Sequence, residues 1–193
     1  MVGSQEPIKF CWILDQDSIP DLEQAPRMKS LASFWGSWQT WRIWQTDNVI
    51  CSDFNTAKDL LKRKWQTQCN LYINQNDYNS LGRPIGVKLF SGEFDSDFPK
   101  KEQVISMMLV GNMYDIVFLV GFDLDDRDHN DEYEKYLWYS YQTAVKRALI
   151  SHPDTQWILI DSDKKIGKRF QDLSNLTSDK IENVLDFLES NQL

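Results

Sequence analysis

Pairs of aspartates, separated by one residue, follow three apolar runs of this sequence. They are Asp15 with Asp17, Asp123 with Asp125, and Asp161 with Asp163. If the runs are parallel strands, their carboxyl ends meet at one edge of a sheet, where ligands of such sheets bind. Neighbouring carboxylates can share a hard cation such as Mg²⁺ or Mn²⁺, which would neutralise a bound diphosphate. The pattern predicts a metal site with Asp123, Asp125, Asp161 and Asp163 as ligands; the alternative is that these aspartates cap helices and solvate loops.

A compact basic cluster follows the last of these apolar runs. It consists of Lys164, Lys165, Lys168 and Arg169. Opposite the acidic loops, its charges could neutralise the phosphates of a ligand, and we count these residues as candidate ligand-binding residues. The alternative is an ordinary solvated helix.

The loop over 123–132 combines many carboxylates with one histidine, His129. An imidazole can accept or release a proton near neutral pH, so Asp123 and His129 are the candidate catalytic residues. His129 can equally be an exposed loop side chain without a catalytic role.

Several enzyme classes lack their motifs here. The chain contains no GxGxxG, GxxxxGK[ST], GxSxG or HExxH sequence, which argues against dinucleotide oxidoreductases, P-loop NTPases, serine hydrolases and zincins. Cys11, Cys51 and Cys69 are an odd number without CxxC spacing. They are expected to behave as small apolar residues rather than as a metal or redox site.

Short apolar runs alternate with segments of helical periodicity from Ile8 to the end of the chain. This alternation is typical of βα units and predicts one three-layer, Rossmann-like α/β domain over 1–193, with a mostly parallel sheet of five or six strands. The expected strands are 8–14, 48–52, 70–73, 86–90, 115–120 and 156–160. The expected helices are 55–65, 99–111, 131–151 and a last one that begins at Thr177.

Tryptophan recurs at every third position in one segment, as Trp35, Trp38, Trp41 and Trp44. Successive members rotate by about 300° on an α-helix, so they spread over a broad face. We expect a helix over 34–44, with at least one ring buried and at least one at the surface. The segment could pack on the sheet, form a platform for a base or sugar, or form a protein interface or an interface between subunits.

The overall composition limits the choice of partners. Lys and Arg total 21 against 29 Asp and Glu, which gives a net charge of −8. Such a chain repels a nucleic-acid backbone, so nucleic acid is not an expected partner. No run approaches the roughly 18–20 apolar residues of a membrane span, and the start lacks the features of a signal peptide. We therefore expect a soluble, cytoplasmic protein.

The segment DIVFLVGFDL, from Asp115 to Leu124, resembles the core of a Rossmannoid family that includes sialyltransferase-like and 6-hydroxymethylpterin pyrophosphokinase-like proteins. The run WILIDSD and the helix at the end are similar too. That family opens with a glycine-rich, phosphate-wrapping loop, and Ser18 matches it. Both glycines are absent, and Asp15 and Asp17 stand there instead. The resemblance implies a donor near Asp15, Asp17 and Ser18, and either a metal restores the charge balance or the fold persists without the activity.

Two classes of function remain open. The first is a transferase-like protein that uses a nucleotide or sugar nucleotide as the diphosphate donor, with Mg²⁺ or Mn²⁺ as cofactor. The second is a non-catalytic interaction or assembly protein, for instance of a virus, that docks through the tryptophan segment. Whether the chain is an enzyme at all is left open by its residues.

Overall fold

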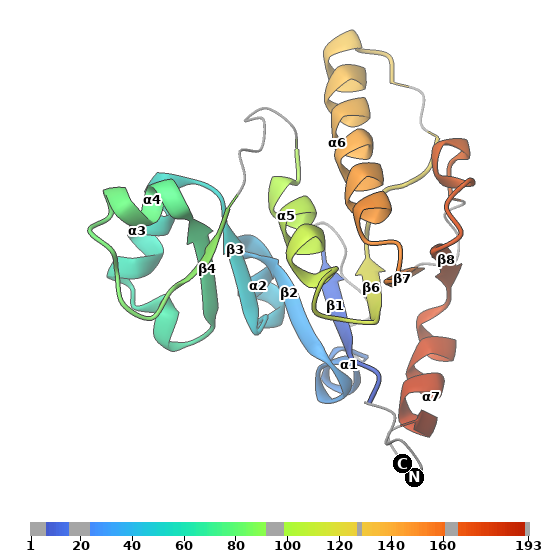
Figure 1. Ribbon diagram of the computed structural model, residues 1–193, viewed down its shortest axis with the longest axis horizontal. Helices are drawn as coiled ribbons and strands as arrows, with labels where there is room; N and C mark the ends of the chain where they lie inside the picture. The colour runs from blue at the N-terminus through green and yellow to red at the C-terminus, as the bar shows by residue number, and fades with distance from the viewer. Residues whose placement is uncertain (1–6, 16–23, 92–98, 127–128, 161–165, 192–193) are drawn as a thin grey trace.

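In the computed structural model, the described residues are 7–15, 24–91, 99–126, 129–160 and 166–191, and their strands form one all-parallel sheet (Figure 1). The eight strands of this described part are β1 Phe10–Leu14, β2 Ser33–Ser37, β3 Asn48–Cys51, β4 Asn70–Asn74, β5 Lys88–Phe90, β6 Ile116–Val120, β7 Gln156–Ile160 and β8 Leu176–Asp179. The α/β class and parallel sheet are confirmed. The expected number of five or six strands is wrong, because β2 and β8 had not been predicted.

Helices cover both faces of the sheet. The α-helices of the described ranges are α1 Ala25–Leu31, α2 Trp38–Trp44, α3 Phe54–Lys62, α4 Gln75–Ser80, α5 Lys101–Val110, α6 Glu132–Ser151 and α7 Ile181–Asn191. Two short 3₁₀ helices, η1 Trp65–Thr67 and η2 Lys168–Phe170, complete the set. Figure 1 shows α3 and α4 at one end of the sheet and β8 with α7 toward the other.

Alternation along the strands divides the core into two layers. In β1, Cys11 and Ile13 pack with residues of α5 and α6, whereas Trp12 and Leu14 pack with residues of α1 and α7. Successive side chains of a strand point to opposite faces, so a central strand must be apolar throughout to be covered on both sides. This is why β6, with the sequence IVFLV, could be recognised from the sequence alone.

The tryptophan segment is a strand followed by a helix, so the prediction of one helix over 34–44 is wrong. Trp35 lies in β2 and is 1% exposed, whereas Trp38 opens α2. The hydroxyl of Ser37 accepts a hydrogen bond from the amide of Thr40 at 3.2 Å, which caps α2 at its N-terminus. The four tryptophans therefore do not lie on one helix, and their three-residue spacing does not define a helical face.

The four rings of this segment are divided between the interior and its margin. Trp35 and Trp44 are buried, and Trp38 and Trp41 are half-buried. The ring of Trp41 packs on Trp65 with 4.1 Å between centroids. The expected buried ring is confirmed, while the rings nearest the surface are still partly covered by the protein itself.

The last helix also begins later than expected. Thr177, its expected first residue, lies in β8, and α7 starts at Ile181. Only Leu176 of β8 is buried, since this strand is at the edge of the sheet. A strand with one apolar residue has no hydrophobic run by which to recognise it.

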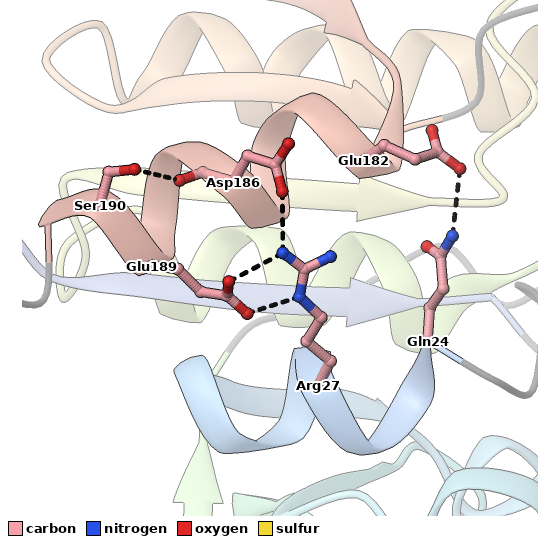
Figure 2. Close-up of polar contacts among 6 residues, drawn as sticks. All are labelled: Gln24, Arg27, Glu182, Asp186, Glu189 and Ser190. Carbon is pink, nitrogen blue, oxygen red and sulfur yellow. Dashed lines mark hydrogen bonds and ion pairs between the residues drawn. The ribbon is translucent and has the colours of Figure 1, made fainter.

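A cluster of ion pairs and hydrogen bonds connects α7 to α1, as Figure 2 shows. Arg27 donates from Nε and Nη2 to the two carboxylate oxygens of Glu189, at 2.5 and 2.8 Å, and from Nη2 to Asp186 at 2.8 Å. Gln24 donates to Glu182 at 3.0 Å. The hydrogen bond from Arg27 lowers the pKa of Glu189. The cluster lies at the surface, so it is sensitive to salt.

Replacing Arg27 by alanine should loosen α7. We expect faster amide hydrogen exchange in α7 at low salt, and a smaller increase in Arg27→Lys, which keeps the charge but loses the two-pronged contact. The difference between Arg27→Ala and the wild type should shrink in 1 M NaCl. Exchange measured by mass spectrometry on peptides of α7 checks this; equal rates in both variants and the wild type would contradict it.

His152, directly after α6, makes stability depend on pH. It is buried beside Trp157, and burial lowers the pKa of its imidazole below the ordinary value of 6.5. The unfolded chain then binds a proton that the folded chain does not, so stability decreases as pH falls below about 6.5. We expect a slope of at most about 1.4 kcal/mol per pH unit from this group. Urea unfolding between pH 7.5 and 5 checks it, and His152→Gln should show a shallower slope.

Candidate functional site

The candidate site lies where the strand order changes direction. Along the sheet the order is β5-β4-β3-β2-β1-β6-β7-β8, so the chain leaves β1 toward one end and returns at β6 on the other side of β1. In open α/β sheets, such a switch point opens a crevice at the carboxyl ends of the two strands. The amide of Asp15 donates to the carbonyl oxygen of Val120 at 2.9 Å, which fixes the residue after β1 against the end of β6.

Asp15 and Lys100 form an ion pair at this switch point. The side chain of Asp15 is 1% exposed and that of Lys100 is 16% exposed, and Nζ of Lys100 donates to the carboxylate of Asp15. Lys100 immediately precedes α5, which packs against β1 and β2. Lys100, which lies between β5 and β6 in the sequence, thus places its ammonium group against Asp15, the residue that follows β1.

Tyr141 of α6 is a buried residue that is hydrogen-bonded to α5. Its hydroxyl donates to Oε1 of Gln103 in α5 at 2.8 Å. Burial raises the pKa of the Tyr141 phenol well above its ordinary value, and the negative charges of Asp15 and Asp123 raise it further. Because β1 and β6 are parallel neighbours, with Leu14 opposite Val120, Asp15 and Asp123 both follow strands that end at the same edge of the sheet.

The acidic loop after β6 is hydrogen-bonded to Gly167 and Lys168, at the start of η2. The amide of Gly167 donates to the carbonyl oxygen of Leu124 at 2.7 Å, and the amide of Lys168 donates to the carboxylate of Asp126 at 3.1 Å. From the other side, Nε2 of Gln142 donates to the carbonyl oxygen of Asp125 at 2.9 Å. These hydrogen bonds hold Asp125 and η2 close to each other.

Two of the predicted residues pack against α6. The guanidinium of Arg169 donates to Oγ1 of Thr143 at 3.0 Å and lies 5.2 Å from the ring centroid of Tyr139. The ring of His129 packs against Trp138 with 5.5 Å between centroids. The arrangement fixes the direction of both side chains by contact with the helix.

The remaining predicted site residues lie outside the described residues. They are Asp17, Ser18, Asp161, Asp163, Lys164 and Lys165. Within the described ranges, no three His, Cys, Asp or Glu side chains are grouped as a metal site. Asp123 and Asp125 supply carboxylate oxygens, which suit Mg²⁺ or Mn²⁺, and a cation there would need further oxygens from Asp161, Asp163 or a ligand.

Sequence reasoning missed Lys100, Gln103 and Tyr141. Lys100 follows an expected strand, β5, and the rule that singled out Asp15 and Asp123 could have been applied to it. Lys100 comes ten residues after the end of β5, however, too far along the chain to be taken for the residue at the end of that strand. Tyr141 lies among the apolar residues of α6 that face the core, and no local sequence signal marks its hydroxyl as functional.

Comparisons with known proteins were made against family models, curated proteins and solved structures, and none of the three returned a match. In the described part of the chain, no helix has both the length and the apolar character that crossing a membrane requires.

Proposed function

We propose that this chain is a transferase-like protein that uses a nucleotide or sugar nucleotide and transfers a group from its diphosphate. The donor binds at the carboxyl edge between β1 and β6. The observation that carries the proposal is the Asp15–Lys100 ion pair at the switch point, in which the side chain of Asp15 is 1% exposed. An arrangement of charges in this crevice is a common feature of ligand sites in α/β sheets.

Lys100 removes the main electrostatic objection to a phosphate ligand at this edge. Asp15 stands where a related protein would have a glycine-rich loop, and its negative charge alone would repel a phosphate. The ammonium group of Lys100 offsets that charge within a direct contact. A phosphate at the mouth of the crevice would then meet a neutral pair.

The backbone of Lys100 gives a second reason. Its φ is 60°, in the left-handed region that residues other than glycine seldom occupy, and the side chain makes no capping hydrogen bond to α5. Such a conformation costs on the order of 1 kcal/mol or more and tends to persist at functional sites. From this backbone position, Nζ of Lys100 donates to the carboxylate of Asp15.

The proposed roles follow from the chemistry of each residue. Asp123, Asp125, Asp161 and Asp163 would hold Mg²⁺ or Mn²⁺, which when bound would neutralise charge on the leaving diphosphate. Lys164, Lys165, Lys168 and Arg169 would contact phosphate oxygens, and Asp15, Asp17 and Ser18 would line the donor side. Asp123 or His129 would accept the proton of the acceptor hydroxyl, whose oxygen bonds to the transferred group as the bond to the diphosphate breaks.

Thermal melting with UDP, GDP, CDP and their sugar conjugates, with and without Mg²⁺ or Mn²⁺, tests the proposal. A ligand at 100 times its Kd should raise the Tm by about 5 to 10 °C for a chain of this size. Asp123→Asn should abolish the metal-dependent part of that shift. The matched control is Asp154→Asn, an exposed change in the turn before β7, at the opposite edge of the sheet.

Two outcomes would contradict the proposal. The first is a wild-type Tm that does not respond to any of these nucleotides at millimolar concentration with either metal. The second is a metal-dependent shift that Asp123→Asn leaves intact. Circular dichroism of each variant separates a lost ligand response from a lost fold.

The second candidate function is a protein interface on α2. Its support is the exposure of that helix, in which Ile43 is 45% exposed and Trp38 and Trp41 are half-buried. Trp35 and Trp44 are buried and would not reach a partner in the folded chain. Ile43→Asp should then reduce the mass of any assembly seen by sedimentation velocity; an unchanged monomer in both proteins removes this candidate.

A further inference from the structure

A groove lies between α3 and the segment that follows α4, away from the switch point. Its volume is about 360 Å³. The lining residues are Phe54, Lys58, Leu61, Lys62, Ser80, Leu81 and Pro84. Apolar side chains supply most of this lining, and two lysines of α3 stand among them. Lys58 and Lys62 are one helical turn apart and both are exposed, so their ammonium groups lie on one side of α3.

The turn over 82–86 holds an isoleucine in solvent next to this groove. Ile85 follows Pro84 of the lining and is 92% exposed. Gly82, Arg83 and Gly86 have φ of 79°, 58° and 84°, and the amide of Arg83 donates to the carbonyl oxygen of Tyr78 at 2.9 Å. The turn has a defined backbone that leaves Ile85 exposed next to the groove, where its side chain is accessible to a docked partner.

The charge of this region is opposite to that of the rest of the chain. Residues 54–88 contain six basic residues, Lys58, Lys62, Arg63, Lys64, Arg83 and Lys88, and two acidic ones, Asp59 and Asp77. Their net charge is 6 − 2 = +4, so the remaining residues carry 15 − 27 = −12. All six basic residues are exposed. Within an acidic chain, the segment that forms the groove thus carries a net positive charge, and Lys58 and Lys62 bring part of that charge to the groove itself.

We propose that this α3/α4 groove docks an acidic peptide segment of a partner protein, with apolar side chains as anchors. The acidic residues of the peptide pair with the lysines at the rim, and its anchors fill the apolar lining and contact Ile85. Charge complementarity brings the two together, and burial of the anchors retains them. A nucleic acid would match the lysines but would leave both Ile85 and the apolar lining without a counterpart.

Selection from random 12-residue peptides displayed on phage tests this proposal. The library is panned on the full chain after depletion on the Lys58→Glu/Lys62→Glu variant, and enriched peptides are synthesised with a fluorescent label. We expect them to combine Asp or Glu with Leu, Ile or Phe. By fluorescence anisotropy they should bind the wild type at least tenfold more tightly than the depletion variant and at least threefold more tightly than Ile85→Ser.

A matched control removes the same amount of positive charge elsewhere. Arg147→Glu/Lys180→Glu changes two exposed residues, one in α6 and one before α7, and should leave the Kd within twofold of the wild type. Circular dichroism shows whether each variant is folded. The peptide site and the nucleotide site are tested with different ligands and variants, so the failure of one does not imply the failure of the other.

Four outcomes would overturn the proposal. The first is a selection that enriches no peptide binding the wild type more tightly than the depletion variant. The second is an enriched pool without acidic residues. The third is that a labelled dT20 oligonucleotide binds the wild type more tightly than the peptides do, and that Lys58→Glu/Lys62→Glu abolishes this binding. The surface would then be a nucleic-acid-binding site. The last is a wild-type dimer in sedimentation velocity that the same variant dissociates, since the occupant would then be a second copy of the chain.

Discussion

Replacing Lys100 by methionine is expected to lower the free energy of unfolding by about 3 to 5 kcal/mol. The change removes the cation that contacts Asp15, whose side chain is 1% exposed. A buried carboxylate without its cation must either stay charged in an apolar environment or take up a proton, and both cost free energy. Urea unfolding at pH 7, followed by circular dichroism, measures the loss.

A double-mutant cycle separates this ion pair from the general effect of each change. Asp15→Asn should cost less than Lys100→Met, because Lys100 is 16% exposed and can turn toward water. The double variant Asp15→Asn/Lys100→Met should recover much of the stability that Lys100→Met loses, since neither charge then remains. A loss below about 1 kcal/mol in Lys100→Met, with no recovery in the double variant, would show that the pair is not a buried one.

The second large effect is expected at Trp35. Trp35→Ala should cost about 3 to 5 kcal/mol, because it leaves a cavity in the layer that packs against α5 and α6. The indole lies between two other rings, with 5.2 Å to the centroid of Tyr72 and 6.4 Å to that of Tyr114. Equilibrium unfolding in urea measures the loss.

Trp38→Ala is the matched control, since it removes the same side chain three residues further along. Trp38 is half-buried and lies beneath the guanidinium of Arg42, at 5.2 Å from its ring centroid. Its removal should cost about 1 to 2 kcal/mol, because less apolar area is lost to solvent. Equal losses at the two positions would contradict the difference in burial between Trp35 and Trp38.

Much of the fold could be predicted because its central strands are covered on both faces. Such strands must be apolar along their whole length, and β1, β6 and β7 show this directly in the sequence. The helix α6 begins after Asp131, whose carboxylate accepts hydrogen bonds from the amides of Tyr133 and Glu134, and its periodicity is regular. In these elements local pattern and burial agree.

Where the local sequence pattern and the burial in the fold disagree, the prediction of the element from the sequence was wrong. The sequence SFWGS of β2 contains a glycine and two serines, and the regular spacing of the tryptophans suggested a helix instead. In the fold, Trp35 pairs with Ile13 of β1 and Asn48 of β3, so the strand is stabilised by neighbours on both sides rather than by its own composition. Pairing of this kind is not visible within a short window of sequence.

By itself the sequence determined the α/β class, most of the strands and the presence of aspartates after β1 and β6. The tertiary structure alone decided which groups these aspartates meet. Lys100 contacts Asp15 across 85 residues of sequence, and Tyr141 of α6 donates a hydrogen bond to Gln103 of α5. The physical reason is that strand order, which places β6 beside β1, is set by the packing of the whole sheet, whereas the tendency to form each strand is local.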